Sequence, residues 1–203
     1  KRLLGGDESF AGIAREWLAL QAKSFTTATL QKAVWMFEQL LFPFIGVRPI
    51  KEITAPELLA VVRRIEARGA HETAHRVRAR AGQVFRYAIA TGRAERDPAA
   101  DLRGALAPIV VTHRAALTEP TAIGGLLRAI DSYKGYPVTV AALKLAPLVF
   151  VRPGELRAAE WSEINFELSE WRIPAARMKM RQGHIVPLST QAIAILRDEL
   201  QPL

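Results

Sequence analysis

The chain has 203 residues, half of them apolar, which is enough for one large domain or two small ones with a buried core. It contains no cysteine, which excludes disulfide bonds, cysteine-ligated zinc and a cysteine nucleophile. The formal net charge of +8 favours a polyanionic partner, nucleic acid before membrane. No apolar run approaches the roughly 20 residues that span a bilayer, so we expect a soluble intracellular protein.

The first half of the chain predicts a bundle of four helices, in which apolar residues recur at helical spacing. Phe10, Ile13 and Trp17 mark the first helix, and the second should end at Pro43. The third opens with the capping pattern Thr54-Ala55-Pro56-Glu57, and the fourth runs from about His71 to Thr91, with Gly92 as its stop. Residues 1–108 are expected to form this helical domain.

The predicted fourth helix carries two stripes of arginine beside its apolar face. Arg76 and Arg80 form one stripe, and Arg78 and Arg86 form the other. Guanidinium groups donate paired hydrogen bonds to phosphate and can also read guanine. Because Glu72 is the only acidic residue on this helix, we predict that the four arginines contact DNA. The alternative is a solvated charged face.

Residues 109–117 lack periodicity and are interpreted as a linker, and residues 118–203 predict a mixed second domain. Three longer helices are expected there, over residues 118–133, 137–150 and 189–200. A strand over residues 170–174 and a hairpin around Arg181-Gln182-Gly183 predict a small sheet. The expected fold class is therefore mainly α with a small β-sheet.

Two motifs in the second half carry the chemistry. Arg152 is followed by Glu155-Leu156 and, nine residues after the arginine, by Trp161. Lys179 lies 27 residues after Arg152, at the start of the predicted hairpin turn, and a Val-Pro-Leu-Ser segment follows it. In these residues and spacings the chain resembles the tyrosine recombinases, the phage-integrase family. The resemblance is greatest to integrases of prophages and genomic islands.

The resemblance implies both a fold and a mechanism. The helical domain would be the family's four-helix, SAM-like core-binding domain, and residues 118–203 the N-terminal part of its α+β catalytic domain. In the family, a tyrosine attacks a DNA phosphodiester and forms a 3′-phosphotyrosyl bond. Arginine stabilises the charge that develops on the phosphate, and lysine protonates the leaving 5′-oxygen. Arg152 and Lys179 match these roles, Glu155 would support the arginine, and Trp161 would pack the arginine bend against the core.

The resemblance also implies a site-specific recombinase that integrates or excises DNA at double-stranded attachment sites. It implies a homotetramer on DNA, no metal or other cofactor, no membrane, and a cytoplasmic, nucleoid-associated location. The family's His-x-x-Arg box does not occur after Lys179, and all three tyrosines precede Arg152. We therefore expect a fragment that binds DNA without cleaving it.

Two other functions remain open at this stage. One is a non-enzymatic DNA-binding regulator that uses a helical bundle, and the other is a helical protein-interaction module with solvated arginines. A regulator has no need of a lysine hairpin beside an Arg-x-x-Glu-Leu bend, which favours the recombinase over it. DNA binding in moderate salt would separate the interaction module from the other two functions.

Overall fold

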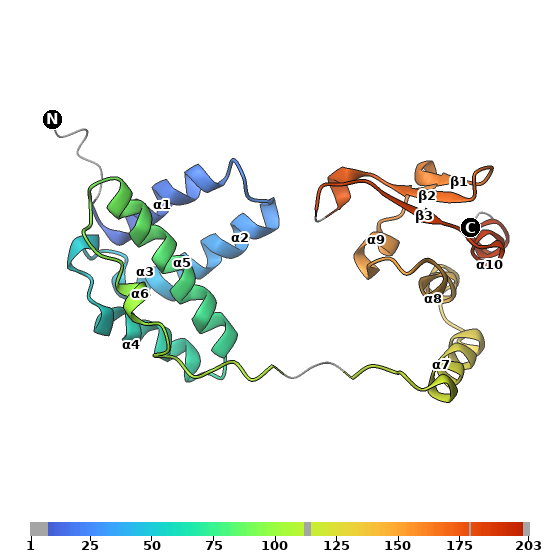
Figure 1. Cartoon of the computed structure of the whole chain (residues 1–203), viewed down its shortest axis with the longest axis horizontal. Coiled ribbons are helices and arrows are strands. Elements are labelled where there is room, and N and C mark those ends of the chain that lie inside the picture. The colour runs from blue at the N-terminus through green and yellow to red at the C-terminus, as the bar shows by residue number, and fades with distance from the viewer. Residues whose placement is uncertain (1–7, 112–114, 179, 201–203) are drawn as a thin grey trace. The chain divides into compact units, whose positions relative to one another are not determined.

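The chain forms two compact units, Lys1–Thr112 and His113–Leu203, each with a hydrophobic core of its own (Figure 1). The structure, a computed structural model, describes residues 8–111, 115–178 and 180–200. Helices dominate these residues, and three short strands form one antiparallel sheet. The expected fold class is therefore confirmed. Among the described residues, no helix combines the length and the apolar character that crossing a bilayer requires.

The first unit is a helical bundle, and the four predicted helices are present in it. Its elements are α1 (Phe10–Gln21), α2 (Thr27–Met36), α3 (Phe42–Ile45), α4 (Ala55–Glu66), α5 (His71–Ala90) and α6 (Pro98–Asp101). The predicted capping box opens α4: the Thr54 amide donates to Glu57 Oε2 over 2.9 Å, and the Glu57 amide donates to Thr54 Oγ1 over 3.4 Å. Gly92 follows α5 in the left-handed region, at φ +73°, where glycine carries no steric penalty.

The prediction that the second helix ends at Pro43 is wrong. After α2 the chain continues through a π-helical segment, Phe37–Leu41, into α3, and Pro43 lies in the first turn of α3. Proline is tolerated in a first turn, because the amide it lacks would have no acceptor within that helix. The continued helix buries Phe37, Leu41 and Ile45.

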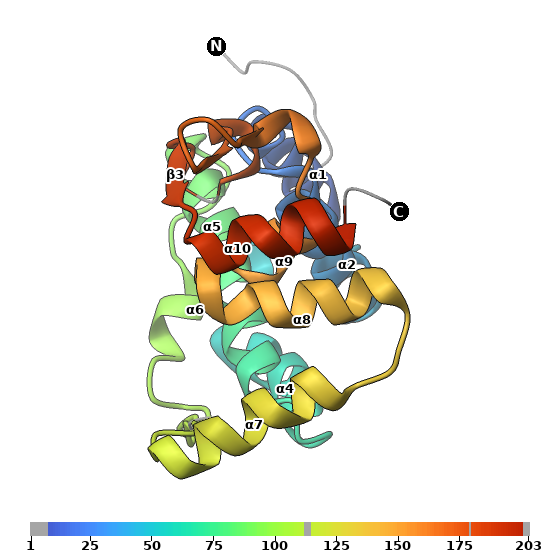
Figure 2. The same ribbon diagram turned by 90° about the vertical axis from the view of Figure 1, so that its right-hand side faces the viewer.

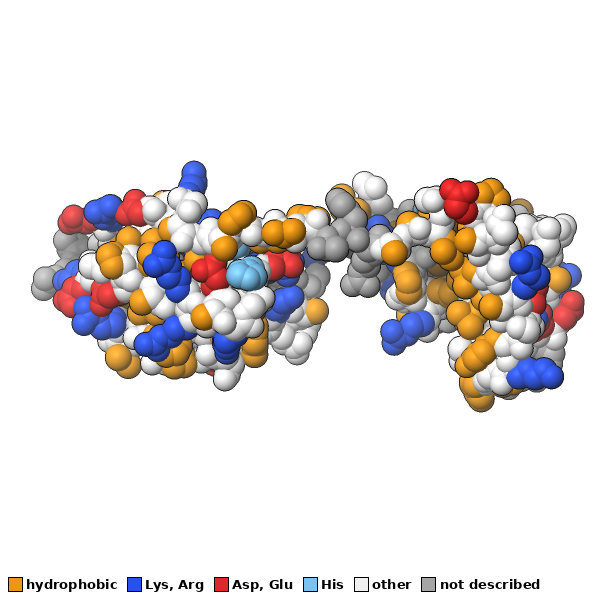
Figure 3. Space-filling model, turned by 90° about the horizontal axis from the view of Figure 1, so that it is seen from below, with side chains coloured by type: hydrophobic (Ala, Val, Ile, Leu, Met, Phe, Trp, Pro, Cys, Tyr) orange, Lys and Arg blue, Asp and Glu red, His pale blue; other side chains and the backbone are white. Residues whose placement is uncertain are grey.

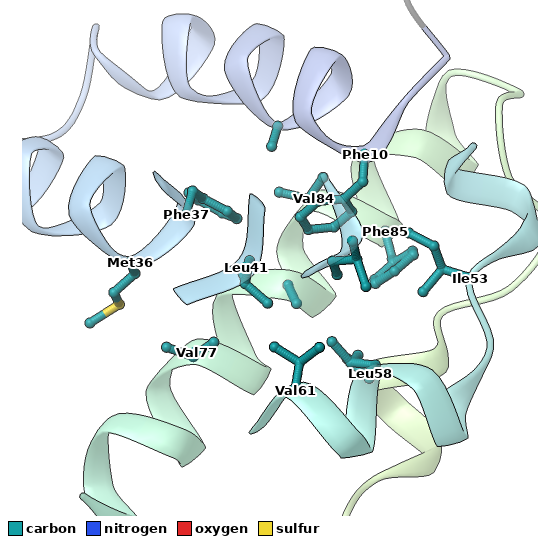
Figure 4. Packing of buried hydrophobic residues seen from close by; sticks show 14 of the residues in the cluster. Phe10, Met36, Phe37, Leu41, Ile53, Leu58, Val61, Val77, Val84 and Phe85 are labelled. Carbon is teal, nitrogen blue, oxygen red and sulfur yellow. The ribbon is translucent and has the colours of Figure 1, made fainter. Parts of the chain in front are cut away.

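Aromatic and aliphatic side chains from all the long helices meet in the core of the first unit (Figure 4). The rings of Phe10 on α1 and Phe85 on α5 lie 5.5 Å apart, centroid to centroid. Val77 and Val84 are buried on the same face of α5, the helix that packs against α4. This packing fixes the rotation of α5 and therefore determines which of its arginines face outward.

The second unit packs helices against one side of its small sheet. Its elements are α7 (Pro120–Ser132), α8 (Pro137–Val149), α9 (Pro153–Arg157), β1 (Ile164–Asn165), β2 (Glu170–Ile173), β3 (His184–Pro187) and α10 (Thr190–Ala194), which continues as a π-helical segment, Ile195–Leu200. The strand order is β1-β2-β3, with Trp171 opposite Val186 and Ile173 opposite His184. The predicted hairpin is thus present. Figure 2 shows α10 beside α8, and residues of both helices enter the core of this unit.

Trp161 does not pack the arginine bend against the core, contrary to the prediction. Its side chain is 51% exposed and lines an open groove together with Tyr136 and Leu156. Trp171 occupies the core position instead and is 1% exposed. Side chains alternate along β2, so that Trp171 and Ile173 face inward while Arg172 faces solvent.

On the face shown in Figure 3, apolar side chains gather on the second unit, whereas lysine and arginine are spread over the first unit. Helix α7 has no buried residue, and it exposes Ile123, Leu126 and Leu127. Helix α8 is apolar almost all round, yet it buries only Ala141, Leu145 and Val149. The described part of the second unit therefore leaves apolar helix faces open to solvent.

Candidate functional site

Arg152 is held at the N-terminus of α9 by Glu155. The Arg152 amide donates to Glu155 Oε2 over 2.9 Å, and Arg152 Nη1 donates to Glu155 Oε1 over 2.6 Å. The carboxylate is nearly buried, at 10% exposure, while the guanidinium remains 61% exposed. Because a guanidinium carries five N–H donors, the bond to Glu155 leaves most of them free for a ligand.

The electrostatics of the bend favour a charged Glu155. The pKa of Glu155 is lowered, first by the hydrogen bond from the Arg152 amide and then by the bond from its guanidinium. The hydrogen bonds of the bend therefore favour the charged carboxylate of Glu155.

The backbone just before the bend is unusual. Phe150 ends α8 in the left-handed region, at φ 49°, and its side chain is 95% exposed. A left-handed bulky residue is rare and costs on the order of 1–3 kcal/mol. This conformation turns the chain from α8 into the extended residue Arg152, whose position caps α9.

Lys179, the second predicted catalytic residue, lies outside the described residues. Before it, a 3-10 turn, Ala175–Arg177, follows β2, and the Met178 amide donates to the Ala175 carbonyl over 3.1 Å. After it, the chain returns as β3, which pairs with β2. The predicted lysine position therefore falls between two described flanks of one hairpin.

The four predicted DNA-binding arginines of α5 divide into two pairs with different partners. Arg86 Nη1 donates to Asp97 Oδ2 over 2.8 Å, and Arg78 Nη1 donates to the Ala99 carbonyl over 3.2 Å. Both partners belong to the segment that forms α6, so this pair ties α6 to α5. The structure thus gives Arg78 and Arg86 bonds within the unit.

Arg76 and Arg80 instead line a groove of about 550 Å³ between α2 and α5, together with Lys32 from α2. No acidic residue is among the described residues that line it. Arg80 lies over the ring of Phe25, 5.0 Å from its centroid, and donates to Gln83 Oε1 over 2.9 Å; partial burial lowers the pKa of its guanidinium. Arg76 forms an exposed ion pair with Glu72, which lies outside the groove lining.

Sequence reasoning missed Lys32 as part of this cationic groove. A single lysine on a helix gives no stripe, and its nearness to Arg76 and Arg80 depends on how α2 packs against α5. No residue near Lys32 in the sequence indicates this contact.

Comparisons with known proteins agree with both halves of this description. The family model described as the phage integrase central domain matches residues 10–105, and the model described as the phage integrase family matches residues 119–202. The fold and the two motifs define a tyrosine-type recombinase scaffold. The chain belongs to the phage integrase family, as its motifs indicated.

The chain is similar in sequence to integrases of phages and prophages. The chain is 39% identical to IntB of Escherichia coli K12 over 202 residues, which covers 94% of this chain and 50% of IntB. It is 36% identical to the integrase of Enterobacteria phage P4 over 205 residues, which covers 95% of this chain and 46% of that integrase. The chain thus spans about half the length of these relatives.

A solved structure of a lambda integrase tetramer bound to a Holliday junction has the same fold. The TM-score is 0.71 at 20% identity, and the match covers 91% of this chain and 53% of that one.

Proposed function

We propose that this chain carries the DNA-binding and phosphate-activating parts of a site-specific DNA recombinase, an integrase of a prophage or genomic island. The observation that carries the proposal is the state of Arg152: Glu155 fixes its position through one nitrogen, and the rest of the guanidinium is open to a ligand. A phosphodiester presents paired oxygens that match this planar fork.

The reaction follows from the chemistry of the phosphate. A tyrosine of the complete recombinase attacks phosphorus, the bond from phosphorus to the 5′-oxygen breaks, and a 3′-phosphotyrosyl bond forms. Arg152 stabilises the negative charge that grows on the non-bridging oxygens. Lys179 donates a proton to the 5′-oxygen, which would otherwise leave as a poor alkoxide. The complete protein is proposed to act as a tetramer on double-stranded attachment sites in the bacterial nucleoid, and to integrate or excise the element.

The cationic groove between α2 and α5 is the proposed DNA contact of the first unit. Arg76 and Arg80 would contact DNA, as their stripe on α5 predicts, and Lys32 on the facing helix α2 would contact it with them. Three cations without an acidic neighbour in the lining favour a polyanion such as the phosphate backbone of DNA. For Arg78 and Arg86 we propose a different role, to hold α6 in place.

Cleavage by the full-length recombinase tests the proposed chemistry. Arg152→Ala should abolish strand cleavage and leave binding to the attachment site nearly unchanged, because the lost interaction matters most in the transition state. Lys179→Ala should fail on ordinary DNA and recover on DNA with a sulfur in place of the 5′-bridging oxygen, since a thiolate leaves without a proton. If Arg152→Ala cleaves normally, Arg152 does not stabilise the transition state. If the unaltered full-length protein cleaves no attachment-site DNA, it is a DNA-binding regulator and not a recombinase.

Salt titration of the 203-residue chain tests the groove. Arg76→Ala, Arg80→Ala and Lys32→Ala should each weaken DNA binding and lower the slope of log affinity against log salt by about one. Arg68→Ala is the matched control, because Arg68 is exposed and lies outside the groove lining. Equal losses in the control and the groove variants would remove the groove from the proposal.

A further inference from the structure

A glutamine lies among the cations of the groove between α2 and α5. Gln83 lines this groove together with Lys32, Arg76 and Arg80. Its side chain is half-buried, and it follows Arg80 by three residues, which places both on one face of α5. Because an amide is neutral, Gln83 adds nothing to the attraction of the groove for phosphate.

A hydrogen bond fixes which end of the Gln83 amide is available. Arg80 Nη1 donates to Gln83 Oε1 over 2.9 Å. A guanidinium has N–H donors and no acceptor, so the atom of the amide that faces it must be the oxygen. The NH2 group of Gln83 is not buried and has no hydrogen-bond partner among the described residues. Its two N–H donors are therefore available to a ligand in the groove.

Arg80 is held in place by contacts that begin in the core of the first unit. Its guanidinium lies over the ring of Phe25, 5.0 Å from the centroid. Phe25 in turn contacts the buried Trp17 edge to face, with the ring centroids 6.1 Å apart. The orientation of the Gln83 amide is thus set before a ligand binds, which lowers the entropy that binding costs.

The oriented amide favours one base of the DNA major groove. A glutamine that is free to turn reads adenine, because its oxygen accepts from N6 and its NH2 group donates to N7. Here the positive guanidinium of Arg80 lies against that oxygen and opposes a second N–H donor. Guanine presents two acceptors, O6 and N7, and no donor at this edge, whereas cytosine presents a donor and thymine a single acceptor.

We infer that Gln83 is a specificity-determining residue that selects guanine in the major groove, and that Arg80 is its positioning residue. The inference rests on the proposed function, because Lys32, Arg76 and Arg80 must bring DNA to the groove. It assigns the base contact to the neutral side chain and leaves the phosphates to the cations.

Salt and sequence together distinguish this role from mere support of Arg80. Replacing a neutral residue removes no cation, so loss of a base contact should leave the salt slope unchanged and flatten the preference at one base pair. If Gln83 only supported Arg80, its replacement would weaken binding to every sequence alike and lower the salt slope, as loss of a phosphate contact does.

The experiment uses the 203-residue chain and a pool of duplexes that are randomised over about two helical turns. Sequencing of the bound duplexes gives the preferred base at each position. The affinity is then measured for four duplexes that differ only at the position whose preference depends on Gln83. The wild type should bind the guanine duplex about tenfold more tightly than the other three, within the range of one base contact.

Gln83→Met keeps the length of the side chain and removes both polar groups. It should reduce the preference for guanine to within about twofold and keep the salt slope of the wild type. Gln31→Met is the matched control, because Gln31 is exposed on α2 and lies outside the groove lining. The control should retain the full preference.

A second variant tests the positioning role and keeps the experiment decisive if Gln83→Met does not fold. Arg80→Met retains an apolar side chain beside Phe25 and removes the guanidinium from Gln83. The amide can then turn and accept from N6, so adenine should bind within about threefold of guanine. The ratio of the two affinities is the readout, because both duplexes lose the same phosphate contact.

The outcomes separate this inference from the proposed DNA contact. If no guanine preference depends on Gln83, or if the dependent position prefers adenine in the wild type, the inference is wrong. An equal loss for all sequences in Gln83→Met, with a lower salt slope, also overturns it. The groove itself stands in these cases if Lys32→Ala and Arg76→Ala still lower the slope. If neither does, the groove is not a DNA contact, and the inference falls with it.

Discussion

Replacing Asp97 by alanine should loosen α6 and destabilise the first unit without weakening its contact with DNA. Asp97 makes two bonds at once: its Oδ1 accepts from the Ala99 amide over 3.0 Å, which caps α6, and its Oδ2 accepts from Arg86 over 2.8 Å. The side chain is only 10% exposed, so water replaces these bonds poorly. The variant removes both the cap and the ion pair.

The magnitude follows from the two bonds. Loss of an N-cap costs about 1 kcal/mol. The ion pair adds roughly 0.2–1 kcal/mol, because the Arg86 side chain is 59% exposed and its charge is well solvated. We therefore expect a loss of about 1–2 kcal/mol, or roughly 5–10 °C in the melting temperature of a unit of this size. Asp97→Asn keeps an oxygen for the cap and should lose about half a kcal/mol.

A double-mutant cycle with Arg86→Ala and Asp97→Ala isolates the pair. Thermal unfolding of the 203-residue chain, with hydrogen exchange at α6 to localise the effect, should give a coupling of about 0.5 kcal/mol between the two side chains. Arg86→Ala should keep the DNA affinity and salt slope of the wild type. A coupling near zero together with a reduced salt slope would show that Arg86 contacts DNA and does not hold α6.

Two further predictions concern the first unit. Hydrogen bonds from Arg93 and then from Tyr87 lower the pKa of Glu16 below its ordinary value of 4.5, so this carboxylate stabilises the fold above that value and the contribution is lost as the pH falls. Glu16→Gln should lower the urea midpoint at pH 7, and its difference from the wild type should shrink as the pH falls below 4.5. Phe85 is fully buried against Phe10, so Phe85→Ala should cost about 3–5 kcal/mol. Circular dichroism should then show loss of the helices of the first unit. The fluorescence of the tryptophans in that unit should change, whereas Trp171 of the second unit should stay buried.

The features that the sequence predicted well are those that local physics decides. The capping box of Thr54 and Glu57 needs only a side chain and an amide three residues apart. The bond between Arg152 and Glu155 has the same range, and the motif spacing therefore implied it. The hairpin followed from a turn glycine between two short strand patterns.

The features that it missed depend on contacts between distant segments. The groove of Lys32 and Arg80 exists only because α2 packs against α5, and nothing near either residue in the sequence indicates the other. The burial of Trp171 in place of Trp161 was easier to predict from the sequence, since alternation along a strand places Trp171 and Ile173 on one face. The motif position of Trp161 taken alone predicts the wrong tryptophan for the core.

Exposure alone does not separate a ligand-binding arginine from a structural one in this chain. Arg86 and Arg152 are nearly equally exposed, at 59% and 61%, and each is paired with a carboxylate that is 10% exposed. Their surroundings differ. Asp97, the partner of Arg86, also caps α6, so the pair holds two helices together. Glu155 lies three residues from Arg152 in the same helical turn, so their ion pair does not connect two elements of the fold. A buried carboxylate that orients an exposed arginine without joining two elements gains little stability from the arrangement, and it keeps the guanidinium ready for a ligand. On this criterion, among the arginines that the structure describes, Arg152 is the one we propose as the phosphate ligand.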